Sequence, residues 1–144
     1  MSVKLLLVGG GKMGAAMLAG WLKGSLNAAD VLVIEPFEQT RNQLAQSLGV
    51  RCVADAAEIP KDVQPKTIVL AVKPQMMDAA LPAYVRFKGP DCLFLSIAAG
   101  KTIGYFEAIL GAGAAIVRAM PNTPAAVGRG ITVGCPNPHV TGPQ

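Results

Sequence analysis

The regular alternation of two kinds of apolar pattern constrains the fold of this chain more than any other feature. Short, nearly continuous apolar runs alternate with segments in which apolar residues recur at helical spacing. Continuous apolar runs are typical of strands buried on both faces of a parallel sheet. Strand and helix in alternation imply right-handed βαβ crossovers. The sequence therefore predicts an α/β domain with a doubly wound, Rossmann-type and mainly parallel sheet.

The predicted elements occupy most of the chain. Strands are expected at Val3–Val8, Val31–Ile34, Arg51–Val53, Thr67–Val72, Cys92–Ala98 and Ala114–Arg118. Helices are expected at Met13–Lys23, at Phe37–Leu48, at Gln75–Val85, where Pro82 bends or ends the helix, and from a cap at Thr102 to Leu110. From residue 108 onward the chain has no acidic residue and is rich in Gly and Pro, so we expect a loop-rich sheet edge. We predict a dinucleotide-binding domain over residues 1–135 and a linker over 136–144.

Composition indicates one domain that folds without metal or disulfide. The chain has 144 residues, of which 51% are hydrophobic and 15% charged, and a domain of this size buries on the order of 70% of its unfolded surface. Its three cysteines, Cys52, Cys92 and Cys135, form no C-x-x-C motif, and the chain has one histidine. This pattern argues against a zinc site and for a reducing compartment. We therefore expect a cytoplasmic protein without a metal.

Charge and hydropathy exclude two classes of partner. The net charge is +4, but the 13 Lys and Arg residues are scattered and form no basic run, so nucleic-acid binding is not supported. The apolar stretch 5–22 is interrupted by Gly9, Gly10, Gly11, Lys12 and Gly14. A membrane span or a signal peptide needs an unbroken apolar segment. We expect neither nucleic acid nor membrane as a partner.

A glycine-rich loop follows the first predicted strand and opens the first predicted helix. The segment Gly9–Gly14 reads GGGKMG and fits the pattern G-x-G-x-x-G. In this context the glycines permit a tight turn, close approach of a pyrophosphate and close packing of helix against strand. The helix N-terminus adds unpaired N–H groups for the phosphates. A tight turn without a ligand is the alternative. The predicted cofactor-binding residues here are Gly9, Gly10, Gly11, Lys12, Met13 and Gly14.

An acidic residue stands where a dinucleotide-binding fold places its ribose ligand. Glu35 ends the second predicted strand, about 20 residues after the loop. A carboxylate there accepts the ribose hydroxyls and repels a 2′-phosphate, which favours NAD over NADP. Arg41 in the following helix weakens that preference, and a solvated acid near a helix start is the alternative. We assign Glu35 to the cofactor site.

Three later strands end in unusual residues. The strand at Thr67–Val72 leads into Lys73-Pro74, the next leads into Ala98-Ala99-Gly100, and the last leads into a loop with two prolines around Asn122-Thr123. Ligands of open α/β sheets bind outside the carboxyl ends of the strands. Taken singly, these residues also fit a solvated lysine, a turn and a stiffened loop. Their convergence on one edge, beside the glycine loop, favours a nicotinamide site.

Four segments together resemble pyrroline-5-carboxylate reductases. They are Gly9–Gly14, Leu70–Gln75, Ser96–Gly100 and Arg118–Ala125, and the resemblance runs in order from about Val3 to Thr132. The third and fourth segments are more diagnostic than the glycine loop. The resemblance implies hydride transfer from NADP(H) or NAD(H) to the imine carbon of 1-pyrroline-5-carboxylate, the last step of proline biosynthesis.

The resemblance also implies site residues. It adds to the cofactor site Ala71, Val72, Lys73, Pro74, Ala98, Ala99, Gly100 and Asn122. Lys73, Asn122 and Thr123 are expected on the nicotinamide and substrate side. We assign no catalytic residue, because a protonated imine is already electrophilic and the main task is to position the hydride donor.

The chain departs from the family pattern in two respects. Segment 54–59 lacks the Asn that often contacts the adenosine, and after the second strand this chain has Glu35-Pro36-Phe37 where many members that prefer NADPH have Ser, Thr or Arg. Family members also continue into a helical C-terminal domain that dimerises and supplies much of the substrate pocket, about where this chain ends. We therefore expect a fragment that binds dinucleotide but is inactive alone, from a homodimeric or larger protein. Two alternatives are a nucleotide-sensing Rossmann module without catalysis and a related imine or hydroxy-acid reductase.

Overall fold

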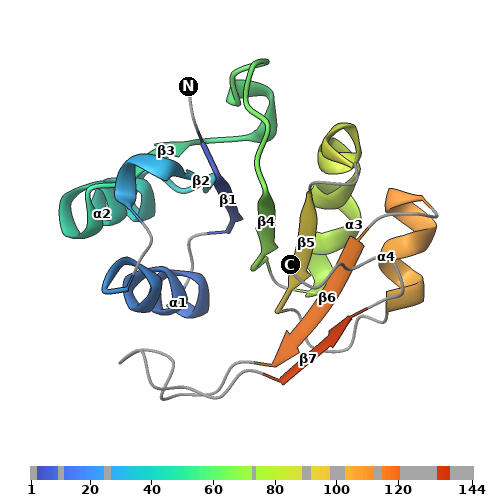
Figure 1. Cartoon of the computed structure of the whole chain (residues 1–144). Helices are drawn as coiled ribbons and strands as arrows, with labels where there is room; N and C mark the ends of the chain where they lie inside the picture. The colour runs from blue at the N-terminus through green and yellow to red at the C-terminus, as the bar shows by residue number, and fades with distance from the viewer. Residues whose placement is uncertain are drawn as a thin grey trace.

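A computed structural model describes residues 3–9, 12–24, 27–72, 74–88, 92–97, 103–111, 115–120 and 133–136. For residues 12, 13, 74, 103, 118–120 and 133–136 it describes the backbone alone. Within these ranges the chain forms one sheet covered by helices (Figure 1).

The sheet has the strand order β3-β2-β1-β4-β5-β6-β7, and its first six strands run parallel (Figure 1). The strands are β1 (Leu5–Val8), β2 (Val31–Ile34), β3 (Arg51–Val53), β4 (Thr67–Leu70), β5 (Leu93–Ser96), β6 (Ala115–Met120) and β7 (Val133–Pro136). From β1 the chain proceeds outward to β2 and β3, and then returns to β4 on the other side of β1. This reversal confirms the predicted doubly wound sheet, and it places the topological switch point between β1 and β4.

Helices cover both faces of the sheet. The α-helices are α1 (Lys12–Leu22), α2 (Glu38–Leu48), α3 (Met77–Ala80) and α4 (Ile103–Leu110), and the 3-10 helices are η1 (Ala28–Asp30), η2 (Ala56–Glu58), η3 (Pro74–Met76) and η4 (Leu81–Phe87). In Figure 1, α1 and α2 lie together on the left, and α3 and α4 lie on the right. Helix α2 ends at Gly49, whose φ of 69° is the left-handed conformation that glycine adopts without strain.

Two apolar cores lie on opposite faces of the sheet. Alternate strand residues supply each core, as the period of a strand requires: Leu6 and Val8 belong to one, and Leu7 to the other. Leu18 and Leu44 of α1 and α2 complete the second core. The first core is completed from the α3, η4 and α4 side by Met77, Leu81, Tyr84, Phe106 and Leu110. The high apolar content of the chain therefore follows in part from a sheet that is buried on both faces.

The predicted helix at Gln75–Val85 is only partly correct. The α-helical conformation is limited to Met77–Ala80, and 3-10 turns lie on either side of it. Pro82 lies in the first turn of η4. Because proline has no N–H to donate and its ring clashes with the preceding turn, an α-helix does not continue through it. The predicted break at Pro82 is thus confirmed, but the segment around it is a tighter helix than expected.

The strand β7 lies where the sequence predicts only loops. It pairs antiparallel with β6, with Met120 opposite Val133 and Val117 opposite Pro136. A four-residue strand with Gly134 and a terminal proline carries no recognisable strand pattern, and proline is tolerated at an edge where its missing N–H is not needed. The sheet thus extends to Pro136, the first residue of the predicted linker. The predicted cap at Thr102 lies outside the described residues.

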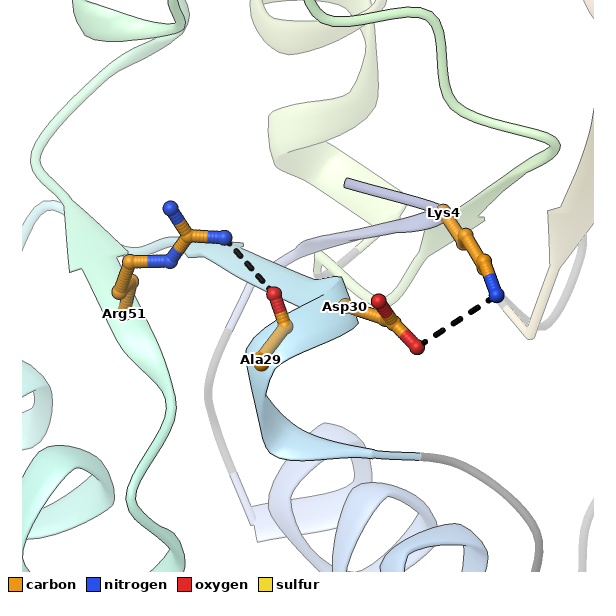
Figure 2. A network of polar contacts seen from close by, with 4 residues as sticks. All are labelled: Lys4, Ala29, Asp30 and Arg51. Carbon is orange, nitrogen blue, oxygen red and sulfur yellow. Dashed lines mark hydrogen bonds and ion pairs between the residues drawn. The ribbon is translucent and has the colours of Figure 1, made fainter. Parts of the chain in front are cut away.

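Polar contacts join three elements at the amino ends of the strands (Figure 2). The ammonium of Lys4 lies 3.7 Å from a carboxylate oxygen of Asp30, and the Lys4 backbone N–H donates to the Asp30 carbonyl at 2.8 Å. Arg51 donates to the carbonyl of Ala29 at 2.8 Å. These contacts tie β1 and β3 to η1, the turn that precedes β2.

The described helices were also compared with the length and hydropathy of a membrane span, and within the described ranges none of them reaches both.

Candidate functional site

The carboxyl ends of the central parallel strands meet at one edge of the sheet, on both sides of the switch point. Backbone hydrogen bonds continue the sheet one residue past each strand end. These bonds run from Gly9 N–H to Ile34 O (2.8 Å), from Ala71 N–H to Val8 O (2.8 Å), from Glu35 N–H to Val53 O (2.9 Å) and from Ile97 N–H to Leu70 O (3.2 Å). The edge therefore holds the ends of β1, β2, β4 and β5 in fixed register, where open α/β sheets bind their ligands.

Gly9 packs closely against the residues that follow β4. Its φ is +95°, and a Cβ atom there would lie 3.0 Å from the carbonyl carbon and oxygen of Ala71 and 3.1 Å from a methyl group of Val72. A side chain would be strained in this conformation and would also press against the neighbouring strand. Gly9 thus has the role predicted for the first glycine of the motif, a tight turn out of β1.

Gly14 allows α1 to approach the same turn. A Cβ atom on Gly14 would lie 2.6 Å from the carbonyl oxygen of Gly9 and 3.3 Å from the Cβ atom of Ala71. Contacts below 3.0 Å essentially never occur for real Cβ atoms, so only glycine permits this packing. This is the role predicted for the third glycine of the motif. The same contact holds the first turn of α1, with its unpaired N–H groups, at the end of β1.

These spaces fit a dinucleotide. A pyrophosphate bound by backbone N–H groups needs a turn without side chains at the start of a helix, and Gly9 and Gly14 keep that position free of Cβ atoms. Residues that would hold a metal are not found: within the described ranges, no group of three or more His, Cys, Asp or Glu side chains comes together. The described part of the edge is therefore suited to phosphate and ribose groups.

Glu35 lies at the end of β2 and is almost fully buried, with 5% of its surface exposed. One of its carboxylate oxygens accepts the backbone N–H of Phe37 at 3.2 Å, in the turn that leads into α2. Arg41, on the second turn of α2, reaches back to the same turn and donates from Nη1 to the carbonyl oxygens of Glu35 and Pro36, both at 2.9 Å. A carboxylate and a guanidinium are therefore both held at the end of β2 by backbone contacts, on the side of the switch point that carries the glycine loop.

Cys52 on the neighbouring strand lies close to both charges. Its thiol lies 3.7 Å from the carbonyl oxygen of Arg41. Burial raises the pKa of this thiol, the positive charge of Arg41 lowers it, and the negative charge of Glu35 raises it. Burial has the largest effect, so the pKa of the thiol is raised, which disfavours the reactive thiolate form.

The turn after β3 satisfies its own polar groups. The carboxylate of Asp55 accepts the N–H of Ala57 at 2.7 Å, and the carboxylate of Glu58 accepts the backbone N–H groups of Ala54 and Asp55. This capping box holds η2 in place without the Asn that the family pattern often shows in this segment. The spacing of Asp55 and Glu58, D-x-x-E, is a signal in the sequence that would have predicted it.

The structure brings together five of the predicted site residues, Gly9, Gly14, Glu35, Ala71 and Val72. Three others are described by their backbone alone: Lys12 and Met13 start α1, and Pro74 starts η3. The remaining predicted residues lie outside the described ranges, and they are Gly10, Gly11, Lys73, Ala98, Ala99, Gly100, Asn122 and Thr123. The steric roles of Gly9 and Gly14 follow from these contacts, whereas the cofactor-binding roles assigned to all of the predicted site residues stay predictions.

Comparison with known proteins identifies the family. The family model described as NADP oxidoreductase coenzyme F420-dependent matches residues 4–100. The pyrroline-5-carboxylate reductase of Mycobacterium leprae is 36% identical over 148 residues, covering 98% of this chain and 49% of that protein. The chain therefore spans about half the length of the curated relatives it matches.

Solved structures agree with the sequence matches. A pyrroline-5-carboxylate reductase from Coxiella burnetii superposes with a TM-score of 0.88 at 26% identity, over 99% of this chain and 53% of that one. The Plasmodium falciparum pyrroline carboxylate reductase with NADP bound superposes with a TM-score of 0.82 at 27% identity, over 98% of this chain and 50% of that one. The predicted resemblance is thus confirmed. The chain belongs to the NADP oxidoreductase coenzyme F420-dependent family, and nearly its whole length is similar to pyrroline-5-carboxylate reductases.

Proposed function

We propose that this chain is the dinucleotide-binding part of a pyrroline-5-carboxylate reductase that uses NADPH or NADH. The observation that carries the proposal is the turn at Gly9 and Gly14, which is kept free of side chains at the switch point between β1 and β4. The curated relatives at 31–36% identity bear the name of this enzyme. One solved relative contains NADP.

The reaction requires a hydride, a proton and an electrophilic carbon. A bound dinucleotide would supply the hydride for the C=N carbon of 1-pyrroline-5-carboxylate, and the protonated nitrogen of that imine would become the amine of proline. Because the protonated imine is electrophilic without further activation, the protein contributes mainly by orienting the two reactants. The site thus needs no nucleophile, and no metal.

We assign each part of this edge of the sheet a role in orienting the dinucleotide and the imine. The glycine loop and the first turn of α1 bind the pyrophosphate, and Glu35 lies beside the adenosine ribose. Ala71 and Val72, with Lys73 and Pro74, line the nicotinamide half. On the same side we place residues 98–100 as the wall of the nicotinamide pocket, and Asn122 and Thr123 as neighbours of the substrate.

The proposal extends to the whole protein. Because the sheet reaches Pro136, residues 1–136 are the cofactor-binding domain and 137–144 the linker to a helical domain that forms a homodimer or larger assembly and completes the imine pocket. Such an enzyme operates in the cytoplasm, in agreement with the scattered cysteines of this chain. These statements rest on the family resemblance and on the half-length match with the relatives.

A binding and turnover experiment tests the proposal. The purified 144-residue chain is titrated with NADPH and with NADH by calorimetry, and its reduction of 1-pyrroline-5-carboxylate is followed by loss of the reduced-nicotinamide absorbance. The Escherichia coli reductase serves as the active reference. We expect saturable binding of at least one dinucleotide and turnover at least ~100-fold below the reference, because the substrate pocket is incomplete. Absence of binding for both dinucleotides would refute the cofactor site. Turnover equal to the reference would refute the proposal that a further domain completes the substrate pocket.

A further inference from the structure

A hydrogen bond joins the two α-helices that follow the neighbouring strands β4 and β5. The hydroxyl of Tyr105, in the first turn of α4, donates to the carboxylate of Asp78, in the first turn of α3. The two strands run parallel with Leu70 opposite Ser96, so the connections to both helices leave the same edge of the sheet. Helices α3 and α4 then cover the same face (Figure 1). The bond therefore ties together two segments that begin at the candidate site.

The core fixes both partners of this bond. Met77 precedes Asp78 and is fully buried in the core on the α3 and α4 side. Phe106 follows Tyr105 and is fully buried in the same core. The rings of Tyr105 and Phe106 meet edge to face, with centroids 5.2 Å apart and an angle of 84° between their planes. This arrangement is a preferred one for aromatic pairs, and it sets the direction of the Tyr105 hydroxyl.

A second contact fixes the same two connections at their strand ends. The backbone N–H of Ile97 donates to the carbonyl oxygen of Leu70 at 3.2 Å. The connection after β4 begins with Ala71 and Val72, which pack so closely on Gly9 that a Cβ atom there would lie 3.0 Å from the Ala71 carbonyl. This connection thus adjoins the turn to which we assign the pyrophosphate. The bond between α3 and α4 sets the separation of the two connections at their helix ends.

A constraint in this position matters more for hydride transfer than for binding. Reacting atoms must lie about 3–3.5 Å apart in a productive orientation, and small displacements lower the rate. A dinucleotide is also held by its pyrophosphate and adenosine ribose, which bind at the glycine loop and the end of β2 in folds of this kind. The proposed function places the nicotinamide half beside Ala71 and Val72. A tie between α3 and α4 therefore acts on the nicotinamide side.

On these grounds, and resting on the proposed function, we propose that Tyr105 and Asp78 are positioning residues for hydride transfer. Their hydrogen bond holds the connections after β4 and β5 at the separation that fixes the nicotinamide ring for reaction. Because the acceptor is a carboxylate, the bond is of the stronger, charge-assisted kind. The proposal requires that loss of the bond affect the nicotinamide half of a bound dinucleotide and spare the adenosine half.

Two readouts on the purified 144-residue chain separate these halves. Calorimetry compares each dinucleotide, NADPH or NADH, with its adenosine half, 2′,5′-ADP or 5′-AMP. The fluorescence anisotropy of the reduced nicotinamide, measured at saturating chain, reports how firmly the ring is held. In Tyr105→Phe we expect a lower anisotropy and a loss of about 2- to 10-fold in dinucleotide affinity, the range of one hydrogen bond. The affinity for the adenosine half should change by about 2-fold or less.

The chain offers a matched control and an internal test. Tyr84→Phe removes the hydroxyl of the other tyrosine, on η4 in the same core, and should leave both readouts unchanged. Asp78→Ala should reproduce the effect of Tyr105→Phe. The double variant should be no worse than either single variant, because all three remove the same bond. Asp78→Asn keeps an acceptor without the charge, so it should retain part of the anisotropy.

The outcomes separate the inference from the proposed function. Absence of binding for both dinucleotides would overturn both proposals. Unchanged anisotropy in Tyr105→Phe, or equal weakening of the dinucleotide and its adenosine half, would overturn the role of the pair and leave the proposed function standing. So would a nicotinamide ring that is as mobile on the unaltered chain as in the free dinucleotide. If Tyr105→Phe does not fold by circular dichroism, Asp78→Ala, at an exposed position, decides by the same criteria.

Discussion

Replacing Gly14 with alanine adds one methyl group at the closest contact between α1 and the end of β1. The new carbon would lie 2.6 Å from the Gly9 carbonyl oxygen, so helix and turn must separate by at least about 0.4 Å to reach 3.0 Å. Insertions into packed regions of this kind typically cost about 1–3 kcal/mol. Alanine also raises helix propensity by up to ~1 kcal/mol in α1, which offsets part of the cost. We expect a net loss of about 1–2 kcal/mol in the free energy of unfolding.

Urea denaturation followed by circular dichroism measures this loss. With a slope of about 2 kcal/mol per M, in the middle of the range for small domains, the midpoint should fall by roughly 0.5–1 M. Gly24→Ala is the matched control, because a Cβ atom there meets only the Trp21 carbonyl oxygen at 3.5 Å, an ordinary contact. Gly14→Ala should also weaken dinucleotide binding, and the control should not. Unchanged stability together with unchanged binding in Gly14→Ala would refute the packing argument.

Two further predictions concern titratable side chains. Partial burial and the hydrogen bond to the Asp78 carboxylate raise the pKa of Tyr105 to about 12, so the folded chain retains this proton when the unfolded chain has lost it. The urea midpoint should therefore fall as the pH rises from about 10 to about 12, and Tyr105→Phe should fall less steeply over this range; equal slopes would contradict the shift. Burial raises the pKa of Cys92 to about 12, and only 4% of the residue is exposed. Iodoacetamide at about pH 8 should label Cys92 only after addition of urea, as read by mass spectrometry, and equal labelling without urea would contradict its burial.

The parts of the fold that depend on local sequence could be predicted closely. Strands β2 and β3 have the predicted bounds, because each is a short run next to a proline or glycine signal. Helix α2 starts one residue after its predicted start and ends at the predicted residue, before Gly49. The site residues Gly9 and Gly14 were also predictable, since the motif states a steric requirement that the structure then shows as short contacts.

The parts that depend on tertiary contacts could not be predicted in the same way. Strand β7 exists because β6 offers an open edge, and nothing within its four residues indicates a partner far along the chain. The 3-10 form of η4 follows from Pro82 together with packing of Leu81 and Tyr84 into the core. The sequence also places Arg41 on a helix without showing that it turns back onto the end of β2.

The two ends of the sheet show why the contacts that matter most to function are the least conspicuous. At the amino end, Lys4 and Asp30 form an ion pair in which the lysine side chain is 59% exposed, and such pairs contribute about 0–1 kcal/mol. At the carboxyl end, Gly9 and Gly14 have no side chains, yet a methyl group added on Gly14 would lie 2.6 Å from the Gly9 carbonyl oxygen and should displace α1. A ligand bound by backbone N–H groups needs that empty space, so the chain cannot fill it to gain stability. Stability must therefore come from the two apolar cores, and loss of function should follow from additions at the glycines rather than from loss of the visible ion pair.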